Sequence, residues 1–142
     1  EQGFFGQWSL RGISEEAVMA MRVLAHWLSF GPALMLAAIP ASAIVGIDGE
    51  TLATVEIGLL AGTPGLAAIG VTIAALTASL RGGTALAGLL LIPLAVPLLV
   101  FGAGALSTGG ESGIALTGAI SLVLVAIAPF ASGAAIRAAR EG

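Results

Sequence analysis

The chain has a single histidine, His26, beside Trp27, one of its two tryptophans, at the start of a long apolar run. An imidazole can ligate haem iron or zinc, or relay a proton. A closed metal site needs further ligands, and the sequence has no second histidine and no cysteine. We therefore predict no metal site. Two interpretations stay open: His26 and Trp27 anchor and pack a helix at the membrane interface, or His26 is a lone haem contact or proton relay.

Glu56 is the acidic residue best placed for a functional role, because it lies inside the start of the second apolar run. A charge at membrane depth is costly unless it faces protein or water, so Glu56 is a candidate for gating, cation binding or pairing across a bundle. The alternative is a helix that starts late, which leaves Glu56 at the outer headgroup level with Asp48 and Glu50. The sequence leaves both interpretations open.

Catalytic motifs are missing from the sequence. A phosphate-binding loop of the G-x-x-x-x-G-K-[ST] type is excluded because the chain has no lysine. There is no H-E-x-x-H, and a single histidine with scattered serines gives no convincing catalytic triad. We predict that the chain is not an enzyme.

The composition indicates a membrane protein. Of 142 residues, 58% are hydrophobic and 9% are charged, and the mean hydropathy is +1.08. A soluble domain would have too few polar side chains to cover its surface, so we expect the lipid bilayer to surround this chain. The net charge of -3, without lysine, leaves no basic patch for a phosphate backbone. No nucleic-acid partner is expected.

Four apolar runs follow one another, at about residues 23–47, 52–80, 84–106 and 114–136. Each reaches the ~20 residues that a helix needs to cross the hydrocarbon layer. The runs are continuously apolar, without the alternation typical of barrel strands. The prediction is an all-α polytopic membrane helix bundle of about four transmembrane helices, which form a transmembrane domain over residues 23–142.

The charges between the runs sort by sign. The loop acids Asp48, Glu50 and Glu111 fall on one side of the predicted membrane, and the five arginines fall on the other: Arg11, Arg22, Arg81, Arg137 and Arg140. By the positive-inside rule, both ends of this sequence are predicted to be cytoplasmic.

Residues 1–22 are predicted to form a cytoplasmic amphipathic coupling segment. Ser14 can cap a helix whose first turn holds Glu15 and Glu16, and we expect this helix to begin at the interface and run into the first span. Upstream, apolar residues alternate with glycine and glutamine, which favours a segment lying on the membrane or on another protein: Phe4, Phe5, Trp8 and Leu10. The alternative is a frayed chain end.

Several residues predict helix interruptions within the spans. Each proline removes a backbone donor and bends its helix unless neighbours compensate. The AGTPG stretch at 61–65 favours a break of the second span into a short outer piece and a main helix, and Gly58 with Gly62 forms a small-residue pair suited to close helix contact. The candidates for helix breaks and gating, besides Glu56, are Gly62, Thr63, Pro64, Pro93 and Pro97.

Four stretches together resemble the cytochrome c maturation protein B (CcmB) family of haem exporter permeases. They are VLAHWLSFGPAL (23–34), LLAGTPGLAAIGVTIAALTASLRGG (59–83), LLLIPLAVPLLVFGAGA (89–105) and APFASGAAIR (128–137). The resemblance implies a six-helix permease of the bacterial inner membrane, of which this chain would be the C-terminal two-thirds. The EQGFFGQWSLRGISEEA stretch departs from the family pattern more than the helices do.

The resemblance also implies a set of partners. These are a separate cytoplasmic ATP-binding subunit, other haem-loading membrane proteins and a periplasmic haem chaperone. ATP hydrolysis in the partner would drive haem export or release of the haem-loaded chaperone, with haem as cargo rather than a firmly bound cofactor. Phe4, Phe5, Trp8 and Leu10 would then dock on the ATPase, and His26 and Trp27 would be candidate haem contacts. The alternative function is a non-transport membrane scaffold of the haem-loading machinery.

Overall fold

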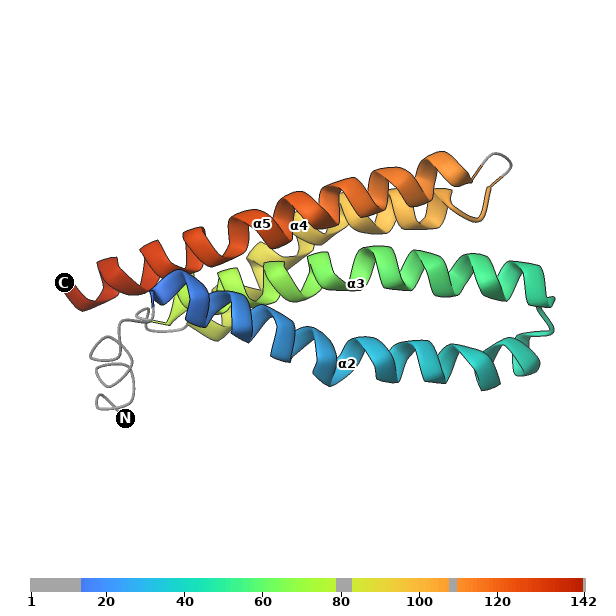
Figure 1. Ribbon diagram of the computed structural model, residues 1–142, viewed down its shortest axis with the longest axis horizontal. Coiled ribbons are helices and arrows are strands. Elements are labelled where there is room, and N and C mark those ends of the chain that lie inside the picture. Colours follow the sequence, from blue (N-terminus) through green and yellow to red (C-terminus); the bar gives the residue numbers. More distant parts are fainter. Residues whose placement is uncertain (1–13, 79–82, 108–109, 142) are drawn as a thin grey trace.

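The computed structural model of the chain describes residues 14–78, 83–107 and 110–141. Within these residues there are four helices and no strand: α2 (Glu15–Val45), α3 (Gly49–Thr77), α4 (Gly83–Gly104) and α5 (Glu111–Glu141). All four are long and apolar enough to cross a membrane. They run alternately up and down, and the α2–α3 and α4–α5 connections lie at the same end of the bundle (Figure 1). The prediction of an all-helical membrane bundle is confirmed.

The helix ends follow from local capping. The Ser14 hydroxyl accepts a hydrogen bond from the Ala17 amide at 3.2 Å, as the sequence predicted, and Glu15 and Glu16 occupy the first turn of α2. The helix then continues without a break into the first apolar run, so the interfacial helix and the first span are one element. At the other end, Gly46 closes α2 in a left-handed conformation with φ 77°. Asp48 caps α3 by accepting a hydrogen bond from the Thr51 amide at 2.8 Å.

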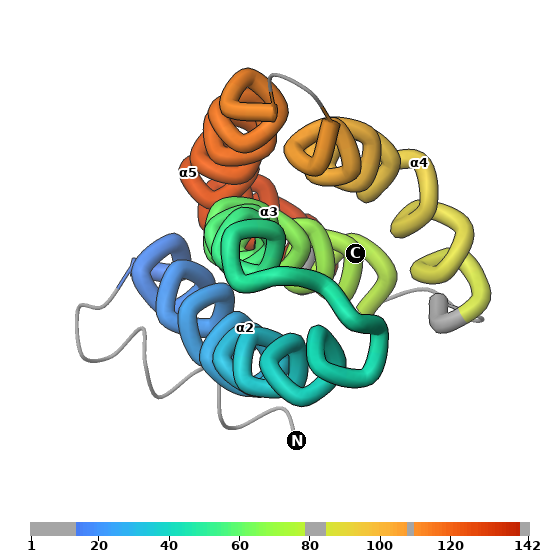
Figure 2. Tube along the Cα trace, turned by 90° about the vertical axis from the view of Figure 1, so that its right-hand side faces the viewer, coloured from blue at the N-terminus to red at the C-terminus, as the bar shows by residue number. Residues whose placement is uncertain are grey.

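Helix α3 lies at the centre of the bundle. It packs against the other three helices, most extensively against α5, while α2 and α4 lie on opposite sides of it (Figure 2). In its most apolar window 44% of the residues are buried, against 11–17% in the other helices. The reason is a face of small residues, which lets neighbouring backbones approach closely. At Gly65, for example, a Cβ atom would lie only 3.0 Å from the Ser121 Cα of α5.

The prolines lie inside helices rather than between them. Pro64 stands within α3, which is a single helix from Gly49 to Thr77, so the expected division at AGTPG is not seen. The N–H that Pro64 lacks would have bonded to the Leu60 carbonyl, so the bond from Thr63 Oγ1 to the Leu59 carbonyl does not replace it. Helix α3 is continuous at this point because it packs against the other three helices. Helix α2, which contains Pro32 and Pro40, changes direction between its two halves in Figure 1, as expected for proline-containing helices.

Gly58 and Gly62, the pair of small residues in α3, differ in what lies opposite them. At Gly62 a Cβ atom would lie 3.2 Å from Thr117 Cγ2, so α3 and α5 are in close contact there, as predicted. At Gly58 a Cβ atom would meet no atom within 4 Å. The close helix contact that the sequence favoured is therefore made by one member of the pair.

Candidate functional site

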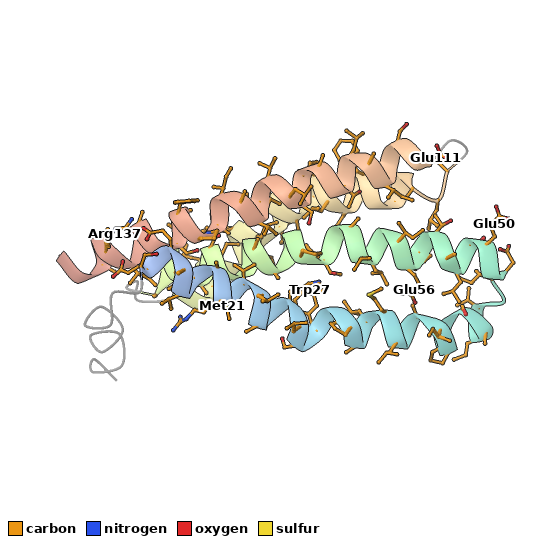
Figure 3. All side chains as sticks on the ribbon, in the orientation of Figure 1. Met21, Trp27, Glu50, Glu56, Glu111 and Arg137 are labelled. Atoms are coloured by element: carbon orange, nitrogen blue, oxygen red, sulfur yellow. The ribbon has the colours of Figure 1, made fainter. Side chains whose placement is uncertain are left out.

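A chain of two hydrogen bonds links α2 to the proline of α3. The indole N–H of Trp27 donates to Thr63 Oγ1 at 2.9 Å, and the Thr63 hydroxyl donates to the Leu59 carbonyl at 2.7 Å. Thr63 is almost completely buried, at 2% exposure, and it directly precedes Pro64, which has no N–H to donate. Figure 3 shows Trp27 between α2 and α3. The position of Trp27 is thereby tied to the backbone around Pro64.

Gly31 makes room for the Trp27 ring. A Cβ atom at this position would lie 2.7 Å from Trp27 Nε1, so the ring occupies the space that a side chain would fill. Trp27 and Thr63 were predicted from the sequence as candidate functional residues, whereas Gly31 was not. A signal was present, because a glycine four residues after a tryptophan lies on the same face of a helix.

His26 is exposed and packs at its edge against Phe30, with ring centroids 5.4 Å apart and an interplanar angle of 61°. Its Nε2 lies 3.3 Å from the position that a Gly70 Cβ would take, so Gly70 of α3 accommodates the imidazole. These contacts support the interpretation of His26 as a helix-packing residue. Within the described part of the chain, no group of three or more His, Cys, Asp or Glu side chains could hold a metal ion. The haem contact and the proton relay stay predictions.

Glu56 lies in a groove between α2 and α3. Its Oε1 is buried and has no hydrogen-bond partner. The groove has a volume of about 440 Å³ and is otherwise apolar near the carboxyl, with Met35, Leu36 and Ile39 contributed by α2. Figure 3 shows Glu56 on the side of α3 that faces α2. Helix α3 begins at Gly49, before Glu56, so the late helix start is not seen.

Glu56 and His26 do not form a common site. His26 lies against Gly70, which is ~21 Å along α3 from Glu56 at 1.5 Å per residue. Pro93 and Pro97 are on a different helix, α4, and line neither the Glu56 groove nor the contact between Trp27 and Thr63. The gating candidates therefore lie in three separate places: the Glu56 groove, the Gly62–Thr63–Pro64 stretch of α3, and α4.

Ion pairs fasten the end of α5 to the start of α2. Arg137 Nη1 lies 2.6 Å from Glu16 Oε1 and 3.4 Å from Glu15 Oε2. Figure 3 places Arg137 at one end of the bundle and Glu50 and Glu111 at the other, which agrees with the predicted separation of charges. Which of these ends is cytoplasmic stays a prediction.

The predicted docking residues lie outside the described residues. These are Phe4, Phe5, Trp8 and Leu10. The described residues begin at Ser14, which directly precedes α2 and its ion pairs with α5.

The comparisons with known proteins agree with one another. The family model described as CcmB protein matches residues 1–139. Heme exporter protein B of Rhodobacter capsulatus is 40% identical over 130 residues, which cover 88% of this chain and 60% of the relative. The protein of the same name from Paracoccus denitrificans is 39% identical over 127 residues, covering 86% and 58%. That of Pseudomonas aeruginosa is 34% identical over 145 residues, covering 96% and 64%. The chain spans about three-fifths of the length of these relatives.

Proposed function

Because the chain belongs to the CcmB protein family, we propose that it is the membrane permease part of an ATP-driven haem exporter complex for cytochrome c maturation. ATP hydrolysis by a separate subunit drives haem export or the release of a haem-loaded periplasmic chaperone. The name heme exporter protein B, carried by its relatives, supports haem as the cargo. The four helices long enough to span a membrane support the permease role.

The observation that carries the coupling role is the attachment of α2 at its start. Glu16, in the first turn of α2, pairs with Arg137 of α5 at 2.6 Å. Farther along the same helix, Trp27 bonds to Thr63 of α3 at 2.9 Å. A displacement of the segment before Ser14 is therefore passed to α5 and to the Pro64 region of α3 through two direct contacts.

The proposed partners are those that the family resemblance implies. Phe4, Phe5, Trp8 and Leu10 dock on a cytoplasmic ATP-binding subunit, and other haem-loading membrane proteins and a periplasmic haem chaperone complete the complex. The chain is a multi-pass membrane protein. We assign it to the bacterial inner membrane with the Arg137 end cytoplasmic, as the positive-inside rule favours. His26 and Trp27 are the candidate haem contacts, and Glu56 is a candidate for gating.

The first experiment purifies the full-length protein from detergent-solubilised membranes, identifies the proteins that copurify and records haem absorbance. Recovery of an ATP-binding subunit together with haem-handling proteins is the expected result. A variant with Phe5→Ser and Trp8→Ser is expected to lose the ATPase but keep its haem-loading partners. Recovery of a colourless protein alone, under conditions that preserve other membrane complexes, would overturn the proposal.

A second experiment separates a permease from a scaffold. Arg137→Glu breaks the contact with Glu16, and the double variant Glu16→Arg with Arg137→Glu restores an opposite-charge pair. A permease loses ATP-dependent chaperone release in the single variant and regains it in the double variant, while the complex stays assembled in both. A scaffold keeps haem loading in both variants.

A further inference from the structure

A cavity of about 340 Å³ lies between α3, the C-terminal half of α4 and α5. It extends along α3 from Thr54 to Leu66. Thr117 lines it on the α5 side, and the α4 side is lined by Leu98, Leu99, Gly102, Ala103, Ala105 and Leu106. None of the residues that line this cavity carries a charge. It is separate from the Glu56 groove, which lies on the α2 side of α3.

Two glycines create the space. A Cβ atom at Gly58 of α3 or at Gly102 of α4 would meet nothing within 4 Å. These glycines therefore do not bring helices together, in contrast to Gly62, whose Cβ position is 3.2 Å from Thr117 Cγ2. A larger side chain at Gly58 or Gly102 would extend into the cavity, because its Cβ atom would not clash with a neighbouring helix.

The polar groups in the lining are already used within their own helices. The hydroxyl of Thr54 donates to the Glu50 carbonyl at 3.1 Å, that of Thr63 to Leu59 at 2.7 Å and that of Thr117 to Gly113 at 2.8 Å. The cavity therefore offers no free hydroxyl proton to a ligand. A carboxylate-bearing molecule such as haem would bury its charges here without donors, which is costly. The chemistry of the lining fits a hydrocarbon chain.

The dimensions and the opening also fit a lipid. From Thr54 to Leu66, α3 advances ~18 Å at 1.5 Å per residue. This is close to the thickness of one leaflet, about half of the ~30 Å hydrocarbon core. Leu99 and Leu106 line the cavity but are also 61% and 57% exposed. The cavity is therefore continuous with the exposed apolar surface at the C-terminal end of α4, which we expect to face the bilayer.

We propose that this cavity binds one acyl chain of a bilayer phospholipid, whose headgroup lies at the end of the bundle that holds Glu50 and Glu111. The chain enters between α3 and α4 past Leu99 and Leu106. The bound lipid fills the space beside Gly58 and Gly102. It thereby supports α4, which packs less extensively against the other helices than α2, α3 or α5 does. This site is independent of haem handling.

Photocrosslinking tests the proposal. The full-length protein is reconstituted in phosphatidylcholine that carries a diazirine group in one acyl chain, and crosslinked residues are mapped by peptide mass spectrometry. Leu98 lines the cavity and is 4% exposed, so lipid of the bulk bilayer does not reach it. Leu89 and Ile92 of α4 are 68% and 66% exposed and report the bulk bilayer. The expected result is labelling of Leu98 together with Leu89 and Ile92.

Filling the cavity is the decisive comparison. Gly58→Leu is expected to reduce labelling of Leu98 at least fivefold while labelling of Leu89 and Ile92 is unchanged. Gly102→Leu fills the same cavity from α4 and replaces the first variant if that does not fold. Gly88→Leu is the matched control, because its Cβ also meets nothing within 4 Å but Gly88 does not line the cavity.

Two outcomes would overturn the proposal. The first is absence of label at Leu98 in the unmodified protein while Leu89 and Ile92 are labelled, which would mean that the cavity is empty or holds a protein segment. The second is that Leu98 is labelled as strongly in Gly58→Leu and in Gly102→Leu as it is in the Gly88→Leu control.

Discussion

Trp27 of α2 and Thr63 of α3 are joined by a hydrogen bond of 2.9 Å, and Thr63 passes the connection to the Leu59 carbonyl at 2.7 Å. A tryptophan near the start of an apolar run, as Trp27 is, ordinarily directs its N–H to the wet membrane interface. Here the N–H is used within the protein, at the residue that precedes the proline of the central helix. Trp27 is therefore a helix-packing residue whose polar atom has one specific partner.

Replacing Thr63 with valine tests this partnership. Thr63→Val keeps the side-chain shape but leaves the indole N–H without its acceptor, so the free energy of unfolding in detergent should fall by about 1 kcal/mol. Trp27 fluorescence should also change, measured in a Trp8→Phe background. Thr77→Val is the control, since the Thr77 hydroxyl bonds to Ile73 of its own helix. Equal effects of the two substitutions would contradict the assignment.

Gly31→Ala should destabilise the bundle, because the new Cβ would lie 2.7 Å from Trp27 Nε1. Overpacking of this kind typically costs about 1–3 kcal/mol, which exceeds the gain of up to ~1 kcal/mol from better helix propensity. Gly88→Ala, where the Cβ meets nothing within 4 Å, should be neutral or stabilising. Thermal unfolding in detergent measures both. A further Trp27→Phe substitution should recover part of the loss, and full additivity would argue against the clash.

Glu56→Leu should make the isolated protein more stable. A buried acceptor without a partner costs about 1–3 kcal/mol, and Glu56 Oε1 is such an atom. Leucine matches the apolar neighbours Met35, Leu36 and Ile39 in the groove. Denaturation in mixed micelles should show a rise of about 1 kcal/mol or more for Glu56→Leu and a smaller one for Glu56→Gln. No rise in either variant would show that the carboxyl has a stabilising partner in solution.

Asp48 should make stability depend on pH in the acid range. The Thr51 amide, together with the Thr51 hydroxyl, lowers the pKa of Asp48 from its ordinary value of 3.8. A carboxylate with a lowered pKa stabilises the folded state above its unfolded pKa, and this contribution is lost as the pH falls through the folded pKa. The difference in unfolding temperature between the unmodified protein and Asp48→Asn should be constant from pH 7 to 5 and shrink below about pH 4. A difference that is independent of pH would contradict this assignment.

The helices and their ends were largely predictable because their signals are local. The apolar runs set the four spans, and Ser14 with Glu15 and Glu16 marked the start of α2 before the run itself begins. The continuity of α3 through Pro64 was not predictable in the same way. A proline signals a lost backbone donor, but whether the helix continues depends on how it packs against neighbouring helices, which a single sequence does not specify.

The tertiary roles of the glycines were beyond the sequence. Gly58 and Gly62 are equivalent in a four-residue pattern, yet one faces open space and the other contacts Thr117. Their difference depends on which neighbouring helix lies opposite each position, and a single sequence does not specify this. The same applies to Gly31, whose role depends on the rotamer of Trp27, and to Glu56, whose burial depends on α2.

The central position of α3 also bears on the order in which the protein is built. Its most extensive contact is with α5, which is the last of these helices to leave the ribosome. At ~5–20 residues per second, synthesis of residues 78–141 takes roughly 3 to 13 seconds. Throughout that interval the face of α3 with Gly65 and Ala68 has neither Ser121 nor Ala128 to cover it. Helix α3 is therefore complete, with the side that faces α5 uncovered, for several seconds before α5 itself has been made.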